Sequence, residues 1–430
     1  MGVRTVAVIG AGAAGLTSAR WLLDAGLEPV VFERTGAVGG IWRPDTGLAY
    51  PSLQTNTSKQ KTAFSDLAFD DALPDHPLRD DVLAYLERYA DVTGVRSRIR
   101  FGRAVAAVRP DGTAWTVDGE PFDAVVIATG LFARELEPSL RDRERFRGTI
   151  VHSGDYRDPT VFAGRDVVVV GAGSSGADIA MELAPIARSV SLSVRRTPTF
   201  TPRHHGGRPY DHRATRLARM LPSPVRRWRT RRAVAEEYRR RGIRFESLAI
   251  NTTPGSDVLD ELARGRIAMR AGTVAVDETG VLFADGTRVD ADALVFATGY
   301  TFEFPFLPPG IPATFEGALA LYRLVFPPGV GGLAFVGMTR VSGPVFPIAE
   351  LQARWVAAVF AGRVELPPPD EMRREIEARI RRAHAIGDDQ MRVELLAYLD
   401  DIASRIGAKP SLVRHPGLLV SPVSAKDYRG

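Results

Sequence analysis

A glycine-rich turn that occurs twice constrains the fold of this chain more than any other feature. Each turn follows a short run of β-branched residues and precedes a segment with helical apolar spacing, after which a second strand-like run follows. The strand, turn, helix and second strand are expected at residues 6–9, 10–15, 16–23 and 29–32, and again at 166–170, 171–176, 177–183 and 189–194. Two βαβ units of this kind predict an α/β chain with two dinucleotide-binding, Rossmann-like domains.

The order of these units predicts that one domain is inserted into the other. Buried strands that end in the small-residue sequence ATG are expected within 124–130 and 293–300, where the chain would leave each unit. We therefore expect residues 1–155 and 300–430 to form a discontinuous first domain, and residues 160–295 to form the inserted second domain.

The first turn, GAGAAG, has the residues that a phosphate-binding turn needs. Glycine permits a tight bend at Gly10, close approach of the backbone to a pyrophosphate at Gly12, and close packing of helix on strand at Gly15. Glu33 ends the second strand of this unit, where a carboxylate can accept hydrogen bonds from ribose hydroxyls. Because FMN lacks an adenosine ribose, the pattern predicts FAD.

The second turn, GAGSSG, predicts a different nucleotide. Its members are Gly171, Gly173, Ser174, Ser175 and Gly176. The strand that follows ends in Arg195 and Arg196, where the first unit has an acidic residue, and guanidinium groups suit a 2′-phosphate. We therefore expect NADPH in the inserted domain. Two surface arginines without such a role remain the alternative in an arginine-rich chain.

Composition excludes several classes of protein. The absence of cysteine rules out disulfide frameworks, thiolate metal sites and the redox-active dithiol of disulfide-reductase flavoproteins. Seven histidines without metal-ligand spacing leave no candidate metal site. Only four of the 56 basic residues are lysine, a bias typical of a G+C-rich bacterial genome, so the net charge of +5 does not indicate nucleic-acid binding. No apolar run reaches the ~18 residues of a membrane span, and we expect a cytoplasmic protein without a membrane partner.

A further motif lies just before the second glycine turn. The sequence FRGTIVHSGDY fits the pattern FxGxxxHxxxY, with the fixed positions occupied by Phe146, Gly148, His152 and Tyr156. Other motifs are GGIW at 39–42, TNTSK at 55–59, ATGY at 297–300, GLAFVGM at 332–338 and PIAELQARW at 347–355. Together they resemble the flavin-containing monooxygenases, which are class B flavoprotein monooxygenases, and we expect a bacterial, soluble member. The resemblance spans almost the whole chain.

The resemblance implies both a chemistry and the residues that serve it. In that family NADPH reduces FAD, O2 adds at flavin C4a, and the resulting hydroperoxide transfers its distal oxygen to a soft nucleophile, so the protein mainly positions groups and excludes water. The resemblance places Asn56 near the flavin and the nicotinamide as a catalytic residue, because its amide offers donors and an acceptor. It also implies cofactor binding by Gly40, Ile41, Trp42, Thr55 and Thr339. The expected function is oxygenation of a small molecule at nitrogen or sulfur.

Two other functions stay open. A Baeyer–Villiger monooxygenase shares both turns but attacks a ketone, and it usually closes the same motif with Trp-Pro, whereas this chain has Tyr156 and Arg157. A flavin reductase or electron-transfer protein would have the same two domains without oxygenation.

Four further expectations concern features other than the glycine turns. By resemblance, His152 holds a hinge between the domains and is not a general base. The arginine-dense segment 203–244 is expected to form a helical cap or lid over the substrate and NADPH, with most of its arginines solvated. Amphipathic helices are expected around 371–382 and 390–406. The oligomeric state is open, with a homodimer as one candidate.

Overall fold

The structure is a computed structural model, and it describes residues 3–245, 252–255 and 257–429. The chain separates into two compact units. Unit 1 consists of Met1–Arg43, Ser58–Ala133 and Phe302–Gly430, and unit 2 consists of Pro44–Thr57 and Arg134–Thr301. Each unit contains a five-stranded parallel sheet, which confirms the predicted α/β class with two Rossmann-like folds.

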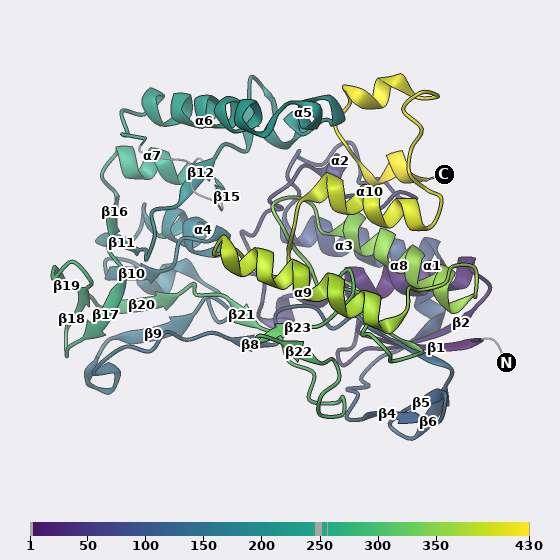
Figure 1. The fold of residues 1–430 in the computed structure, drawn as a ribbon. Coiled ribbons are helices and arrows are strands. Elements are labelled where there is room, and N and C mark those ends of the chain that lie inside the picture. Colours follow the sequence, from purple (N-terminus) through teal and green to yellow (C-terminus); the bar gives the residue numbers. More distant parts are fainter. Residues whose placement is uncertain (1–2, 246–251, 256, 430) are drawn as a thin grey trace. The chain divides into compact units, whose positions relative to one another are not determined.

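Unit 1 is built on the strand order β24-β7-β1-β2-β3. The strands are β1 (Thr5–Ile9), β2 (Glu28–Phe32), β3 (Ile99–Arg100), β7 (Ala124–Ile127) and β24 (Leu333–Phe335). Side chains alternate across a strand, so Val6 and Val8 of β1 enter one core while Ala7 and Ile9 enter another. In the first core, α1 (Ala13–Asp24) packs against α8 (Phe346–Phe360) (Figure 1). The second core is closed by the antiparallel strands β4 (Val108–Asp111), β5 (Ala114–Val117) and β6 (Glu120–Phe122).

Unit 2 repeats the plan with the order β16-β11-β10-β20-β9. The strands are β9 (Thr149–His152), β10 (Asp166–Val170), β11 (Ser189–Ser193), β16 (Ile267–Arg270) and β20 (Ala293–Phe296). Val167 and Val169 face the core formed with α4 (Ser174–Leu183) and α7 (Asp257–Ala263). Val168 and Val170 face the core under the antiparallel strands β17 (Thr273–Val276), β18 (Gly280–Phe283) and β19 (Arg288–Asp290).

The boundaries of unit 2 differ from the predicted limits of the inserted domain. The unit begins at Arg134 and not at 160, because residues 149–152 form β9, where Val151 pairs with Val295 of β20. It also includes Pro44–Thr57, because Tyr50 is buried in its core.

The C-terminal helices differ from the prediction in one place. The pattern around 371–382 lies within α9 (Pro369–Ala385), but the helix expected over 390–406 is α10 (Leu395–Arg405). It begins late because the Glu394 carboxylate caps it by accepting from the Ala397 N–H at 2.9 Å. The preceding residues form the short strand β26 (Arg392–Val393). Within the described ranges, no helix is both long and apolar enough to cross a membrane.

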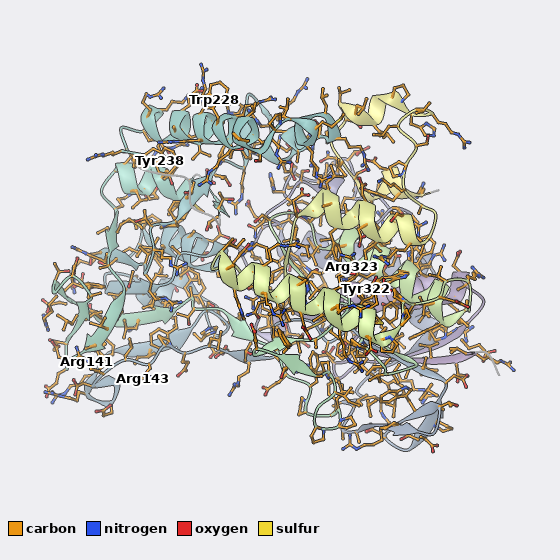
Figure 2. All side chains as sticks on the ribbon, in the orientation of Figure 1. Arg141, Arg143, Trp228, Tyr238, Tyr322 and Arg323 are labelled. Atoms are coloured by element: carbon orange, nitrogen blue, oxygen red, sulfur yellow. The ribbon has the colours of Figure 1, made fainter. Side chains whose placement is uncertain are left out.

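The arginine-dense segment contains the helices α5 (Arg216–Met220) and α6 (Ser223–Arg240). Helix α6 has one buried face and one exposed face. Figure 2 shows Tyr238 and Trp228 on α6. Tyr238 is buried and its hydroxyl accepts from the Phe200 N–H at 2.9 Å, whereas Trp228 is 58% exposed. Arg203 and Arg216 are buried, whereas the arginines at 227, 229, 231 and 232 are exposed. Some arginines of the segment are therefore not in solvent, while those on the outer face of α6 are, as predicted.

Candidate active site

The first glycine turn connects β1 to α1 in unit 1, and two of its positions accept only glycine. Gly10 has φ of 107°, and a Cβ there would lie 2.7 Å from the Ala128 carbonyl oxygen. A Cβ on Gly15 would lie 1.7 Å from the Gly10 carbonyl oxygen. These contacts explain the tight bend and the close helix packing that the spacing predicts.

Gly12 and Gly40 bring two loops of unit 1 together, backbone to backbone. A Cβ on Gly40, where φ is 55°, would lie 2.9 Å from the Gly12 Cα. Gly40 begins a 3-10 turn, Gly40–Trp42, in which Ile41 and Trp42 are half-buried and Trp42 packs against the core. The predicted residues of GGIW therefore lie beside the phosphate-binding turn.

Glu33 is tied to the first turn through its carboxylate. The side chain is buried, and one oxygen accepts from the Ala11 N–H at 2.7 Å. The other oxygen accepts from the N–H and the hydroxyl of Thr35, each at 2.9 Å. A carboxylate has about four acceptor positions, so these contacts orient the group and leave capacity for a ribose hydroxyl. Ribose binding by Glu33 stays a prediction.

Thr339 provides an unsatisfied polar atom near the same turn. Its side chain is 2% exposed, and its hydroxyl has no hydrogen-bond partner among the described residues. It follows β24, and a Cβ on Gly337 would lie 3.2 Å from the Ala14 Cβ, which places this loop at the start of α1. No side chain caps α1 and no acid lies in its first turn, so the helix start suits a pyrophosphate. The residues of unit 1 therefore fit FAD.

The second glycine turn connects β10 to α4 in unit 2. A Cβ on Gly171 (φ 105°) would lie 2.5 Å from the Ala297 carbonyl oxygen, and one on Gly176 would lie 1.9 Å from the Gly171 carbonyl oxygen. Gly173 is different, because a Cβ there would meet no atom within 4 Å. Open space therefore faces the start of α4, whose first residues are Ser174 and Ser175 and which has no side-chain cap.

Three arginines lie near the carboxyl end of β11. Arg195 and Arg196 are exposed and form no ion pair with any residue that the structure describes. Arg270, at the end of β16, pairs in register with Ser193, and its carbonyl accepts from the Val194 N–H at 3.0 Å. The Arg270 Nε atom is buried and has no partner within the described ranges. The sequence analysis did not place Arg270 near this position because it did not predict a strand at 267–270. The pattern that could have indicated it is an arginine at the end of the strand-like run IAMR. The exposed guanidinium groups of Arg195 and Arg196 suit a nucleotide 2′-phosphate.

Thr55 and Asn56 belong to unit 2 and not to the domain in which they were predicted. Thr55 is buried, while Asn56 is exposed and donates from its amide nitrogen to the Ser174 hydroxyl at 3.1 Å. The structure therefore brings Asn56 to the second glycine turn. Its contact with the flavin stays a prediction.

His152 is held at the end of β9 by its neighbours. It is 4% exposed, and its Nδ1 atom accepts from the Gly154 N–H at 3.1 Å. The same nitrogen lies 3.1 Å from a carboxylate oxygen of Glu135, and the ring meets Tyr300 edge-on. These contacts are of the kind that a structural histidine makes. Among the described residues, no group of three or more His, Asp or Glu side chains could hold a metal ion.

Two Rossmann-like units, each with a glycine turn before a helix, define a two-dinucleotide oxidoreductase. The profile of the flavin-binding monooxygenase-like (FMO-like) family matches residues 3–423. The chain belongs to this family, and it is an NADPH-dependent FAD monooxygenase that acts on small molecules.

Two mammalian relatives cover nearly the whole chain. Dimethylaniline monooxygenase (N-oxide-forming) 4 of Mus musculus is 34% identical over a gapped alignment of length 445, which covers 95% of this chain and 79% of the relative. Flavin-containing monooxygenase 5 of Oryctolagus cuniculus is 34% identical over a gapped alignment of length 456, which covers 96% of this chain and 84% of the relative. Because both relatives are eukaryotic, they do not support the expectation of a bacterial, soluble member.

Solved structures show the same fold. S-allyl-L-cysteine S-oxygenase from Allium sativum has a TM-score of 0.71 at 27% identity, with 94% of this chain and 88% of that chain covered. The open crystal structure of cyclohexanone monooxygenase has the same TM-score of 0.71 at 20% identity, with 94% and 98% covered. The second similarity extends to the fold alone.

Proposed function

We propose that the protein transfers one oxygen atom of O2 to nitrogen or sulfur of a small organic substrate. Bound FAD, once reduced by NADPH, supplies the oxygen activation. The residues of the chain bind the two nucleotides, orient the nicotinamide nucleotide and exclude water. Asn56 contributes by holding NADP+ at the second glycine turn, which its bond to Ser174 supports.

The observation that carries the choice of nitrogen or sulfur is the structure around Tyr156 and Arg157. Tyr156 is 1% exposed, and its phenol donates to the Glu182 carboxylate at 2.9 Å. Burial raises the pKa of this phenol well above its usual value, so it stays a donor. The Arg157 guanidinium donates to the carbonyls of Gly154 and Tyr156. In a Trp-Pro pair, usual in ketone-oxidising relatives, the indole N–H could replace the phenol as a donor, but proline has no side-chain donor to replace the Arg157 guanidinium.

The names of two relatives agree with this choice. The mouse relative is N-oxide-forming and the garlic protein is an S-oxygenase. Cyclohexanone monooxygenase shares the fold alone, and ketone oxidation is therefore the second candidate.

Product analysis tests the proposal. The purified protein is given NADPH and O2 with a tertiary amine, a sulfide or a ketone, and products are identified by mass spectrometry while H2O2 is measured. We expect an N-oxide or a sulfoxide with about one product per NADPH. An ester from the ketone alone would instead support the Baeyer–Villiger reaction. Peroxide equal to the NADPH consumed with every substrate would indicate a reductase.

The proposal also covers the cellular setting. We propose a bacterial, cytoplasmic enzyme without a membrane or nucleic-acid partner, with a homodimer as its assembly. The arginine bias supports the bacterial origin, and the charged fraction of 25% with a mean hydropathy of −0.07 supports the cytoplasmic location. Fractionation of expressing cells tests the location, and light scattering during size exclusion tests the dimer.

A further inference from the structure

The segment 44–57 is anchored in unit 2 by a buried tyrosine. Tyr50 is 2% exposed and belongs to the hydrophobic core of unit 2, with Leu53 of the same segment packed against that core. Its ring meets the ring of Tyr156 edge-on, with centroids 6.2 Å apart. An aromatic side chain buried to this extent holds its segment by loss of apolar surface from water.

The Tyr50 hydroxyl enters a buried polar network. It donates to one Asp178 carboxylate oxygen at 2.9 Å, and the Arg203 guanidinium lies 3.2 Å from the other oxygen. Asp178 and Arg203 are each 9% exposed. Burial raises the pKa of the Asp178 carboxyl, and the Arg203 charge and the Tyr50 hydrogen bond oppose that rise. The network joins three separate segments: 44–57, helix α4 and the start of the arginine-dense segment.

The network and Asn56 hold the same helix at neighbouring positions. Asn56 donates to Ser174, the first residue of α4, and Tyr50 donates to Asp178, four residues later. Residues at i and i+4 lie on one face of a helix, so both bonds connect the segment to one face of α4 at its nucleotide end. A hydrogen bond from exposed Asn56 alone would be weak in water, and the buried network supplies the rigidity that it lacks.

We propose that Tyr50, Asp178 and Arg203 are positioning residues that hold Asn56 against the second glycine turn. The proposal rests on the proposed role of Asn56 in holding NADP+. Without the network, the segment leaves α4, Asn56 loses Ser174, and NADP+ is held less well while oxygen transfer takes place. The glycine turn and Glu33 of unit 1 lie outside this segment, so we expect FAD to stay bound.

The test compares Tyr50→Phe with Tyr156→Phe as a matched control. Each change removes one buried phenol that donates to a carboxylate of α4, but Glu182, the partner of Tyr156, lies about one turn beyond Asp178 and two turns beyond Ser174, the partner of Asn56. In Tyr50→Phe we expect normal FAD content, NADP+ affinity about three- to tenfold weaker, more H2O2 per NADPH at saturating NADPH, and faster hydrogen exchange of 44–57 even in FAD-free protein. The control should change NADP+ affinity, H2O2 release and exchange of 44–57 less than Tyr50→Phe does, because its partner lies farther from the nucleotide end of α4.

A double-mutant cycle with Asn56→Ala tests whether Tyr50 acts through Asn56. We expect Tyr50→Phe to cause little further loss of NADP+ affinity when Asn56 is already alanine. Three results would each overturn the proposal. The first is that Tyr50→Phe forms as little H2O2 per NADPH as the wild type and exchanges hydrogen in 44–57 at the same rate; the second is that the Tyr156→Phe control changes equally. The third is that the losses of NADP+ affinity in Tyr50→Phe and Asn56→Ala are fully additive. If Asn56→Ala alone still forms one product per NADPH without extra H2O2, the proposed function of Asn56 fails. Unchanged hydrogen exchange of 44–57 in Tyr50→Phe would separately disprove the anchoring by Tyr50.

Discussion

Substitution of Gly173 by alanine should separate nucleotide binding from folding. Gly173 precedes α4 with φ of −70°, a conformation that alanine adopts, and its added Cβ would meet no atom within 4 Å. We therefore expect the free energy of unfolding to change by less than about 1 kcal/mol. Gly176→Ala should instead disrupt the turn, because its Cβ would lie 1.9 Å from the Gly171 carbonyl oxygen.

The effect on NADP+ follows from the open space at the start of α4. The methyl group of Gly173→Ala would occupy the space through which a pyrophosphate approaches the N–H groups of the first turn. If two charge-assisted hydrogen bonds are lost, each worth ~1.5–3 kcal/mol, the affinity falls by a factor of about 100 or more.

Thermal unfolding with and without NADP+ measures both effects. At a ligand concentration of about 100 times the wild-type Kd, the wild type should gain about 2.7 kcal/mol, and Gly173→Ala only about 0.4 kcal/mol. Gly331→Ala in unit 1 is the control, because its Cβ also meets no atom within 4 Å. If Gly173→Ala gains the full stabilisation, no phosphate approaches this turn, and the assignment of the second nucleotide site is wrong.

Three further substitutions test separate parts of the site and the fold. Joint replacement of Arg195 and Arg196 by alanine should weaken NADPH about tenfold or more relative to NADH in steady-state kinetics, because only NADPH has the 2′-phosphate. Asn56→Ala should keep FAD and its reduction by NADPH, but should release H2O2 in place of product, as counted per NADPH. Burial raises the pKa of the Glu350 carboxyl from 4.5 to about 7. As pH rises, the carboxyl of the unfolded chain ionises before that of the folded chain, so the free energy of unfolding falls between about pH 4.5 and 7. Glutamine carries no such charge. Denaturant titrations at pH 8 should therefore show Glu350→Gln more stable than the wild type by about 3 kcal/mol.

Controls and contrary results for these substitutions are specific. Arg188→Ala removes a charge at the amino end of the same sheet, where Arg188 pairs with Asp166, and it should leave nucleotide preference unchanged. Equal losses for NADPH and NADH would make Arg195 and Arg196 structural. Wild-type coupling in Asn56→Ala would reduce Asn56 to a loop residue. Glu365 is exposed, so Glu365→Gln should not alter the pH dependence, and an unchanged pH slope in Glu350→Gln would contradict the reasoning about burial.

Local features of the sequence were sufficient to predict both βαβ units. The strand expected at 166–170 is β10, and the helices after the two turns lie where the apolar spacing places them. Such elements depend on neighbouring residues, since β-branched runs favour strands and glycine permits the turns. The same reasoning was wrong at 390–394, because the Glu394 side chain determines where α10 begins.

Sequence alone determined the family, both cofactors and the residue types of the two turns. The tertiary structure decided which unit holds 44–57, and it joined Arg270 to the arginines that follow β11. The physical reason is separation along the chain: Tyr50 bonds to Asp178 across 128 positions, and Asn56 to Ser174 across 118. No local pattern encodes such pairs, because they form only when packing of the hydrophobic cores brings distant segments together.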